Sequence, residues 1–155
     1  MERKQRRTIP AGKMCAGMKR LDSFQTKSES IAYIQENVFG CANRKLAEKY
    51  LIEKLPKESY YQEKIISFLK KNYPEGVVWK ETAGAYSRRG IPDITFILDG
   101  RYYGFEVKRP FLGVLSLLQE QTIKKLREAG AVAEVVTFPE EVQKIIEKKK
   151  NEVGE

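Results

Sequence analysis

A turn between two apolar segments is the feature that most constrains the fold of this 155-residue chain. Residues 93–98 and 102–107 have the composition of strands, and Asp99-Gly100 separates them. An Asp-Gly pair between two such segments is typical of a tight β-hairpin. The hairpin predicts two antiparallel strands, so that the start of the first lies beside the end of the second.

Charged residues occupy the positions that this hairpin brings together. Asp93 begins the first strand, whereas Glu106 and Lys108 lie at the end of the second. Because strand side chains alternate between the two faces of a sheet, Glu106 and Lys108 share one face. We therefore expect Asp93 to lie close to both of them.

The remaining pattern predicts the other elements of an α/β fold. Their order is helix, three strands, helix, strand, helix, which indicates a mixed four-stranded sheet flanked by helices. An Asn-Tyr-Pro-Glu-Gly segment ends the first helix, and Gly130 ends the second. The elements outside the hairpin are helices at about 58–73, 115–129 and 139–150 and strands at 77–82 and 132–138.

The residue types exclude several kinds of chemistry. The sequence has no histidine, so Ser-His-Asp and Cys-His catalysis and histidine metal sites are ruled out. Cys15 and Cys41 have no CxxC spacing, and they support neither a zinc module nor a disulfide framework. Hydrolytic chemistry would therefore depend on carboxylates, lysine and a hard metal ion.

The charged hairpin positions suit such a metal ion. Adjacent carboxylates repel each other unless a cation separates them, and a few oxygen ligands with open water positions suit Mg²⁺ or Mn²⁺. A neighbouring lysine can orient or deprotonate a water molecule, or stabilise charge on a phosphoryl group. The pattern thus indicates phosphodiester hydrolysis. The alternative is that Asp93, Glu106 and Lys108 form ordinary surface ion pairs.

Short motifs in this region resemble those of a known nuclease family. Pro92-Asp93 and Glu106-Val107-Lys108 resemble the signature of the PD-(D/E)XK nuclease superfamily. The segments Gly90–Asp93 and Phe105–Lys108, with Ser116-x-x-Gln119, are similar to the virus-type replication-repair nuclease (VRR-NUC) domain. The resemblance covers about residues 58–138.

This resemblance implies a fold, a cofactor and roles for individual residues. The implied fold is an α-β-β-β-α-β core like that of restriction endonucleases, and the implied cofactor is Mg²⁺ or Mn²⁺. Asp93, Glu106 and the backbone carbonyl of Val107 would hold the metal. Lys108 would be the catalytic lysine, and Gln119 would lie over the metal site to hold water or phosphate.

Gln119 has two possible roles. It falls on the apolar stripe of its helix, formed by Leu115, Leu118, Thr122, Ile123 and Leu126, and an inward polar group needs a partner. The metal site would supply that partner. The alternative is a capping box with Ser116.

The first helix carries two candidate glutamates. Projection at 100° per residue places Glu58 near the inner stripe of Tyr61, Ile65, Phe68 and Leu69, and it places Glu63 well off this stripe. The family commonly has an acidic residue on this helix that contacts metal-bound water. We assign that role to Glu58. The alternative is that Ser59, which is spaced from Gln62 like a capping box, is the N-cap and leaves Glu58 outside the helix.

Four basic residues are candidates for phosphate contacts, with ordinary solvated side chains as the alternative. Two of them lie in a Gly-containing loop at 83–90, where Tyr86 is a candidate for stacking on a base. The four residues are Lys80, Arg88, Arg89 and Arg109.

The charge pattern divides the chain into three parts. Residues 1–27 carry eight Lys or Arg and two acidic residues, and so contribute +6 of the net +8. We predict a flexible basic arm that a polyanion could order; a solubilising tail is the alternative. Residues 28–57 form an accessory helical extension with helices at 31–39 and 44–55, and residues 58–155 form the nuclease-like domain with a C-terminal helix. The chain has no membrane-length apolar run and no signal peptide, which predicts a cytoplasmic location.

Together these features predict a metal-dependent, structure-specific DNA endonuclease. Small members of the family act on branched DNA, such as junctions and flaps, and tend to form dimers. The resemblance therefore implies a branched DNA substrate in replication, repair or recombination, a homodimer, and a phage or prophage origin. The alternatives are a sequence-specific restriction-like endonuclease and a non-catalytic DNA-binding subunit with a nuclease fold.

Overall fold

The computed structural model describes residues 19–40, 43–82 and 90–152. The chain divides into two compact units, Met1–Leu55 and Pro56–Glu155. The sequence-based division into arm, extension and nuclease-like domain stays a prediction. Most of the predicted arm lies outside the described residues, as do Cys15, Cys41 and the greater part of the loop at 83–90.

The first unit is helical. Thr26 accepts a hydrogen bond from the backbone of Glu29, whose side chain accepts in return from the Thr26 N–H, and this capping box starts the first long helix at Lys27 rather than at the predicted residue 31. Asn43 caps the last helix of the unit through Leu46 N–H. The elements are η1 (Leu21–Ser23), α1 (Lys27–Ile34), the π-helical turn η2 (Gln35–Phe39) and α2 (Arg44–Lys54).

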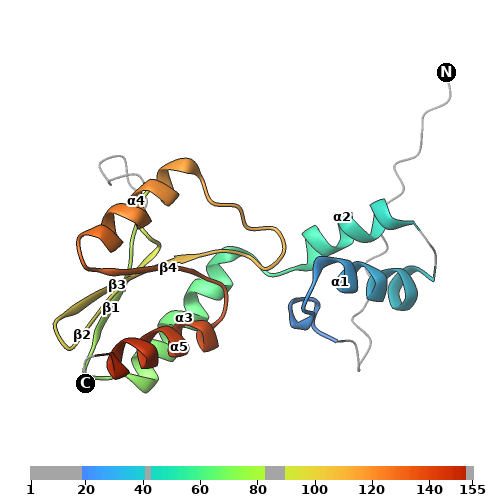
Figure 1. The fold of residues 1–155 in the computed structure, drawn as a ribbon. Coiled ribbons are helices and arrows are strands. Elements are labelled where there is room, and N and C mark those ends of the chain that lie inside the picture. Colours follow the sequence, from blue (N-terminus) through green and yellow to red (C-terminus); the bar gives the residue numbers. More distant parts are fainter. Residues whose placement is uncertain (1–18, 41–42, 83–89, 153–155) are drawn as a thin grey trace. The chain divides into compact units, whose positions relative to one another are not determined.

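The second unit has the predicted order of elements (Figure 1). The helix-strand-strand-strand-helix-strand-helix sequence and the mixed α/β fold are confirmed. The elements are α3 (Glu58–Asn72), β1 (Val77–Lys80), β2 (Ile94–Leu98), β3 (Arg101–Val107), α4 (Leu117–Glu128), β4 (Val132–Val136) and α5 (Pro139–Asn151).

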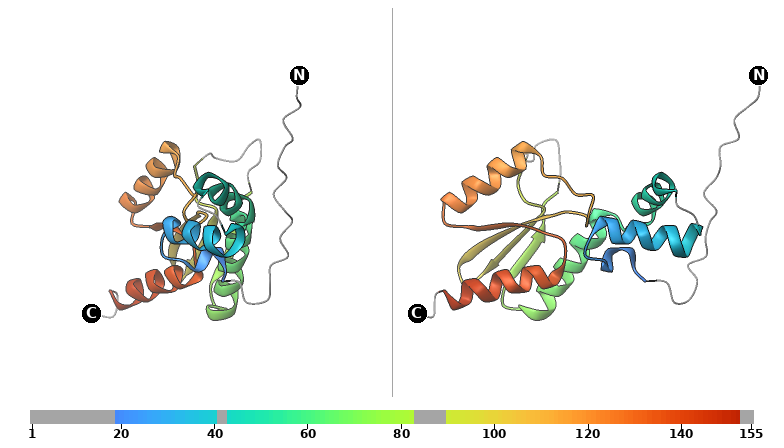
Figure 2. Two further views of the ribbon diagram at one scale, coloured as in Figure 1. Left: turned by 90° about the vertical axis from the view of Figure 1, so that its right-hand side faces the viewer. Right: turned by 45° about the vertical axis from the view of Figure 1, so that its right-hand side comes forward.

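The four strands lie in the order β1-β2-β3-β4. β1–β2 and β2–β3 are antiparallel, whereas β3 and β4 are parallel because α4 crosses between them. Asp99 and Gly100 both have positive φ angles, 51° and 72°, as a type I′ hairpin turn requires. Helices α3 and α5 lie on one face of this sheet and α4 on the other (Figures 1 and 2).

The core of this unit lies between the sheet and the α3/α5 layer. Alternate strand residues face this layer, and Ile94, Phe96 and Phe105 are completely buried there. On α3, Tyr61, Ile65 and Leu69 form the buried stripe that the helical projection predicts, with Phe68 partly buried beside it. None of the helices within the described residues has the length and apolar character that a membrane span requires.

Some local predictions were wrong. For α3 it is the alternative that is excluded: Lys57, not Ser59, is the N-cap, it makes no side-chain capping bond, and Glu58 is the first helical residue. Leu118 on α4 is 44% exposed although its spacing placed it on the inner stripe, since α4 packs mainly against β4 and buries Ile123. The strand and helix ends otherwise differ from the predicted ends by about two residues, as is usual for such boundaries.

We expect Gly76→Ala to destabilise the second unit. A Cβ atom at this position would lie 2.3 Å from the Phe96 ring, which is buried in the core. The overpacking should lower the free energy of unfolding by about 1–3 kcal/mol. Urea unfolding of the full chain, followed by the emission of Trp79, measures this change in the unit that contains Gly76.

Val77→Ala is the matched control, because Val77 is the next residue and is 61% exposed. Its free energy of unfolding should stay within about 0.5 kcal/mol of the wild type. Equal stability of the two variants would mean that Phe96 moves aside at no cost.

Candidate active site

The β2–β3 pairing brings Asp93 beside Glu106. Ile94 pairs with Phe105, so the next pair along the ladder is Asp93 and Glu106. The Asp93 side chain is fixed at this end of the strand, because its Oδ2 accepts a hydrogen bond of 2.8 Å from Val107 N–H. The juxtaposition of these two carboxylates agrees with the expectation from the hairpin.

Glu106 is a buried charged residue, with 1% of its surface exposed. Its Oε1 atom lies 2.7 Å from Lys108 Nζ and also accepts a hydrogen bond from Gln119 Nε2. Its Oε2 atom is buried and has no hydrogen-bond partner within the described part of the chain. A buried carboxylate oxygen without a partner is costly, so this atom is a candidate ligand for a cation or a water molecule.

Gln119 forms the capping box that was one of its two possible roles, and it also contacts Glu106; its role in holding water or phosphate stays a prediction. Its backbone N–H donates to Ser116 Oγ at 3.3 Å, while its Oε1 accepts from Ser116 N–H at 2.9 Å. This capping box starts α4. The Nε2 atom of the same amide donates to Glu106, so one side chain joins the start of α4 to the sheet.

Glu58 lies in the same electrostatic environment as these residues. It is half-buried at the start of α3, and burial raises its pKa. The positive charges of Lys108 and Arg109 lower its pKa, and the negative charge of Asp93 raises it. Glu63, one and a half turns further along α3, is exposed. Both positions agree with the helical projection, and the role of Glu58 stays a prediction.

Burial and hydrogen bonding shift the pKa values of Glu106 and Lys108 at the centre of the site. Burial raises the pKa of Glu106; the hydrogen bond from Lys108 acts against this shift, and the charge of Asp93 adds to it. For Lys108, burial acts to lower the pKa, but the hydrogen bond to Glu106 and three neighbouring carboxylates raise it overall. Lys108 is therefore positively charged at neutral pH, with its side chain 14% exposed.

The donor set fits a hard metal ion with several water ligands. Among the described residues, no three acidic or cysteine side chains form a group that could surround a metal by themselves. Two carboxylates, Asp93 and Glu106, and the carbonyl oxygen of Val107 are the oxygen donors that Mg²⁺ and Mn²⁺ prefer, and Mg²⁺ commonly keeps several waters. The partnerless Oε2 of Glu106 agrees with this donor set.

The structure describes two of the four residues predicted to bind phosphate, Lys80 and Arg109. Arg109 is half-buried and close enough to Glu58 to lower its pKa. Lys80 is exposed and pairs with Ile94, so its side chain leaves β1 on the opposite face from its neighbour Trp79. Arg88, Arg89 and Tyr86 lie outside the described residues.

A hydrogen-bonded group beside the carboxylates was not predicted from the sequence. Glu81 N–H donates to the carbonyl of Asp93 at 2.8 Å, which places Glu81 next to Asp93 across the β1–β2 ladder. Glu81 Oε1 accepts from Trp79 Nε1 at 2.8 Å and from Thr95 Oγ1 at 2.9 Å. The alternation of residues along the first strand could have indicated that Trp79 and Glu81 share one face.

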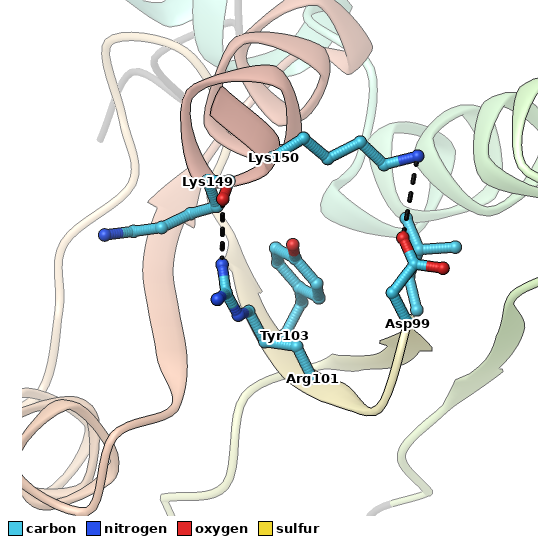
Figure 3. Close-up of a pocket in the computed structure, with 6 residues that line it drawn as sticks. Asp99, Arg101, Tyr103, Lys149 and Lys150 are labelled. Carbon is cyan, nitrogen blue, oxygen red and sulfur yellow. Dashed lines mark hydrogen bonds and ion pairs between the residues drawn. The ribbon is translucent and has the colours of Figure 1, made fainter. Parts of the chain in front are cut away.

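A pocket of about 300 Å³ lies at the other end of the sheet (Figure 3). Its basic groups are engaged: Arg101 Nη1 donates to the Lys149 carbonyl at 3.0 Å, and Lys150 Nζ lies 3.7 Å from Asp99 (Figure 3). The end of α5 contributes the negative pole of a helix here, which disfavours anions. This pocket lacks paired carboxylates, so the Asp93–Glu106 region is the better candidate for catalysis.

Comparisons with known proteins give one structural similarity. No protein-family model matches the chain, and no curated protein gives a significant match. The chain is similar to a solved structure described as a "VRR_NUC domain", with a TM-score of 0.47 and 27% sequence identity. The similarity covers 56% of this chain and 95% of that structure. The description names the same domain type that the sequence motifs resemble.

We expect Mn²⁺ to stabilise the wild-type protein through Asp93 and Glu106. An ion that binds the folded state at one hundred times its dissociation constant adds about 2.7 kcal/mol to the free energy of unfolding. Asp93→Asn retains an oxygen acceptor for Val107 N–H but removes the charge, so Mn²⁺ should no longer raise its melting temperature. Thermal unfolding of the full chain with and without Mn²⁺ measures this shift.

Asp99→Asn is the matched control, because Asp99 lies in the hairpin turn and asparagine tolerates its positive φ angle. This variant should respond to Mn²⁺ like the wild type. A full Mn²⁺ response in folded Asp93→Asn would exclude Asp93 as a ligand.

Proposed function

We propose that this chain is a metal-dependent DNA endonuclease that hydrolyses phosphodiester bonds in branched DNA. The observation that carries the proposal is the buried carboxylate of Glu106. It lies beside Asp93, shares one oxygen between Lys108 and Gln119, and has a second oxygen without a described hydrogen-bond partner. This arrangement offers a carboxylate oxygen to a metal ion and a lysine to the reacting phosphate, as metal-assisted hydrolysis can use.

The residues present fit a divalent metal ion. Asp93, Glu106 and the carbonyl oxygen of Val107 would hold Mg²⁺ or Mn²⁺, and Glu58 would contact one of its water ligands. The bound ion would supply Lewis acidity toward the phosphoryl group and lower the pKa of a bound water molecule. The carboxylates have the hard oxygen donors that such an ion requires.

The chain's own side chains would perform the remaining tasks. Lys108 is charged and held 2.7 Å from Glu106, so it can stabilise negative charge that develops on the phosphoryl oxygens. Gln119 fixes the orientation of Glu106 from the start of α4. Arg109 adds a positive charge near Glu58, where it can contact a phosphate of the DNA backbone.

The branched substrate and the homodimer are further parts of the proposal. A single site cuts one strand, so paired cuts at a junction call for two sites, which a symmetric dimer supplies. Light scattering on the free and DNA-bound protein measures the oligomeric state. The restriction-like alternative differs in substrate, since it predicts cleavage of a linear duplex at a defined sequence.

A non-catalytic DNA-binding subunit is less well supported. Burying a glutamate with a lysine and a glutamine around it is costly, and metal-assisted hydrolysis gives this group a use that DNA binding alone does not. The first unit and the basic N-terminal residues can contribute to DNA binding in either case, because lysine and arginine bind phosphates without regard to sequence.

Lys108→Met tests the proposed activity. Purified wild-type protein should cut junction or flap DNA in the presence of Mn²⁺, in preference to linear duplex and single strands. The variant should lose at least about a hundredfold in rate because it lacks the positive charge at the reacting phosphate, yet still respond to Mn²⁺ in thermal unfolding.

Lys150→Met provides the control for removing a lysine, since Lys150 lies at the opposite end of the sheet beside Asp99. Its cleavage rate should match the wild type. Absence of cleavage by the wild-type protein on all four DNA forms with Mn²⁺ or Mg²⁺ would refute the proposed activity.

Substitutions of the two glutamates of α3, Glu58 and Glu63, should have very different effects on the cleavage rate. Glu58→Gln should reduce cleavage about ten- to a hundredfold, the usual effect of losing an outer partner of a metal site, whereas Glu63→Gln should have little effect. Both rates are measured in Mn²⁺ at matched protein concentration. The opposite ranking would show that Glu63, not Glu58, serves the site.

A further inference from the structure

An exposed aromatic residue lies on the same face of the sheet as the candidate carboxylates. Trp79 on β1 is 41% exposed, and it is the single tryptophan of the sequence. Large aromatic residues are usually well covered in a folded domain. Two further apolar residues on the same face, Val77 and Ile97, are 61% and 38% exposed.

The strand register places Trp79 next to the site. Trp79 pairs with Thr95, and Thr95 is two residues from Asp93, so all three leave the sheet on one face. From the standard spacings within and between strands, the Cα atoms of Trp79 and Asp93 are roughly 8 Å apart. A nucleotide at the carboxylates and its neighbour in the same strand can therefore both be reached from this surface.

The indole ring is held in a fixed orientation. Its Nε1–H donates to Glu81 Oε1, which also accepts from Thr95 Oγ1, and Thr95 Oγ1 lies 3.3 Å from the Tyr102 hydroxyl. Thr95 is 1% exposed, so this network is anchored in the sheet. The ring nitrogen of Trp79 thus has no hydrogen bond left to offer, so the contact that this exposed residue can add to a ligand is an apolar one.

Charge indicates which part of a nucleic acid would lie on this ring. The Glu81 carboxylate at the edge of the indole repels phosphate, whereas Lys108 and Arg109 on the other side of Asp93 attract it. A nucleobase is uncharged and stacks well on an indole. Bases within a duplex are covered on both sides by their neighbours, so an unpaired base is the one free to stack here, and the single-stranded arms of flap and splayed-arm DNA offer such bases.

From these observations we infer that Trp79 binds an unpaired nucleobase adjacent to the cleaved phosphate and so favours DNA with a single-stranded arm over fully paired DNA. This inference rests on the proposed function, because it assigns a substrate contact to the same site. Trp79 is then a specificity-determining residue. It takes no part in the hydrolysis itself.

The emission of the single tryptophan reports the proposed contact directly. Full-length protein is titrated in EDTA with a splayed-arm duplex, with a fully paired duplex of equal length, and with a splayed-arm duplex that has abasic sites in place of the unpaired bases. We expect the splayed-arm DNA to quench the emission strongly, and the other two DNAs to quench it little. Fluorescence anisotropy of labelled DNA measures binding independently in the same samples.

Substitution provides a second measurement. Trp79→Ala should weaken binding of the splayed-arm DNA about 5- to 100-fold, the range for loss of one base–aromatic stack, and leave binding of the paired duplex unchanged. Trp79→Phe should retain part of the affinity because it retains a ring. Val77→Ala, on the same strand and face, should bind both DNAs like the wild type.

The other outcomes of these experiments would contradict the inference, and each would do so for a different reason. Binding of splayed-arm DNA without quenching, or with equal affinity for Trp79→Ala, would overturn the stacking role and leave the nuclease proposal intact. Emission that changes with protein concentration in the absence of DNA would assign this face to self-association instead. Failure to bind or cut any DNA would overturn the proposed function and this inference together.

Discussion

The burial of one carboxylate, that of Glu106, is the constraint on which the rest of the second unit depends. A charged group removed from water costs several kcal/mol unless charged or hydrogen-bonding partners compensate. The partners come from two places: Lys108 follows two residues later along the chain, and Gln119 extends from the start of α4. These contacts therefore fix the end of β3, the start of α4 and the connection between them relative to one another.

The two faces of the sheet carry different kinds of side chain. One face carries the apolar residues that pack on α3 and α5, and the core of the unit lies there. The other face carries the polar group of Glu106, Thr95 and Glu81, together with the exposed ring of Trp79. Because side chains alternate along each strand, the same short strands provide both the apolar core and the candidate site.

The hairpin and its charged ends could be predicted from the sequence because the signals are local. Asp99-Gly100 determines the turn, the period of two determines the face, and the pairing of Asp93 with Glu106 follows from both. The capping role of Gln119 could also be predicted, since Ser116 lies three residues before it in the sequence. That the same amide reaches Glu106 depends on how α4 packs against the sheet, and a local pattern leaves this open.

The missed features depend on tertiary packing. Leu118 has the spacing of a core residue, yet it is exposed because α4 packs mainly against β4. Ser59 has the spacing of a cap, but α3 begins two residues earlier than a cap at Ser59 would place it. The Trp79–Glu81–Thr95 group joins two strands through side-chain hydrogen bonds, and such contacts become visible only when the register is known.

The double role of Gln119 has a consequence for cooperativity. Its amide completes the first turn of α4 with Ser116 and also donates to Glu106, so fraying of that turn also breaks this contact of the carboxylate. Local opening at this helix terminus would therefore leave Glu106 with Lys108 as its remaining described partner. Backbone amide exchange at Gln119 should therefore report the fraction of molecules in which the Gln119–Glu106 contact is intact, because the same opening breaks both hydrogen bonds of this residue.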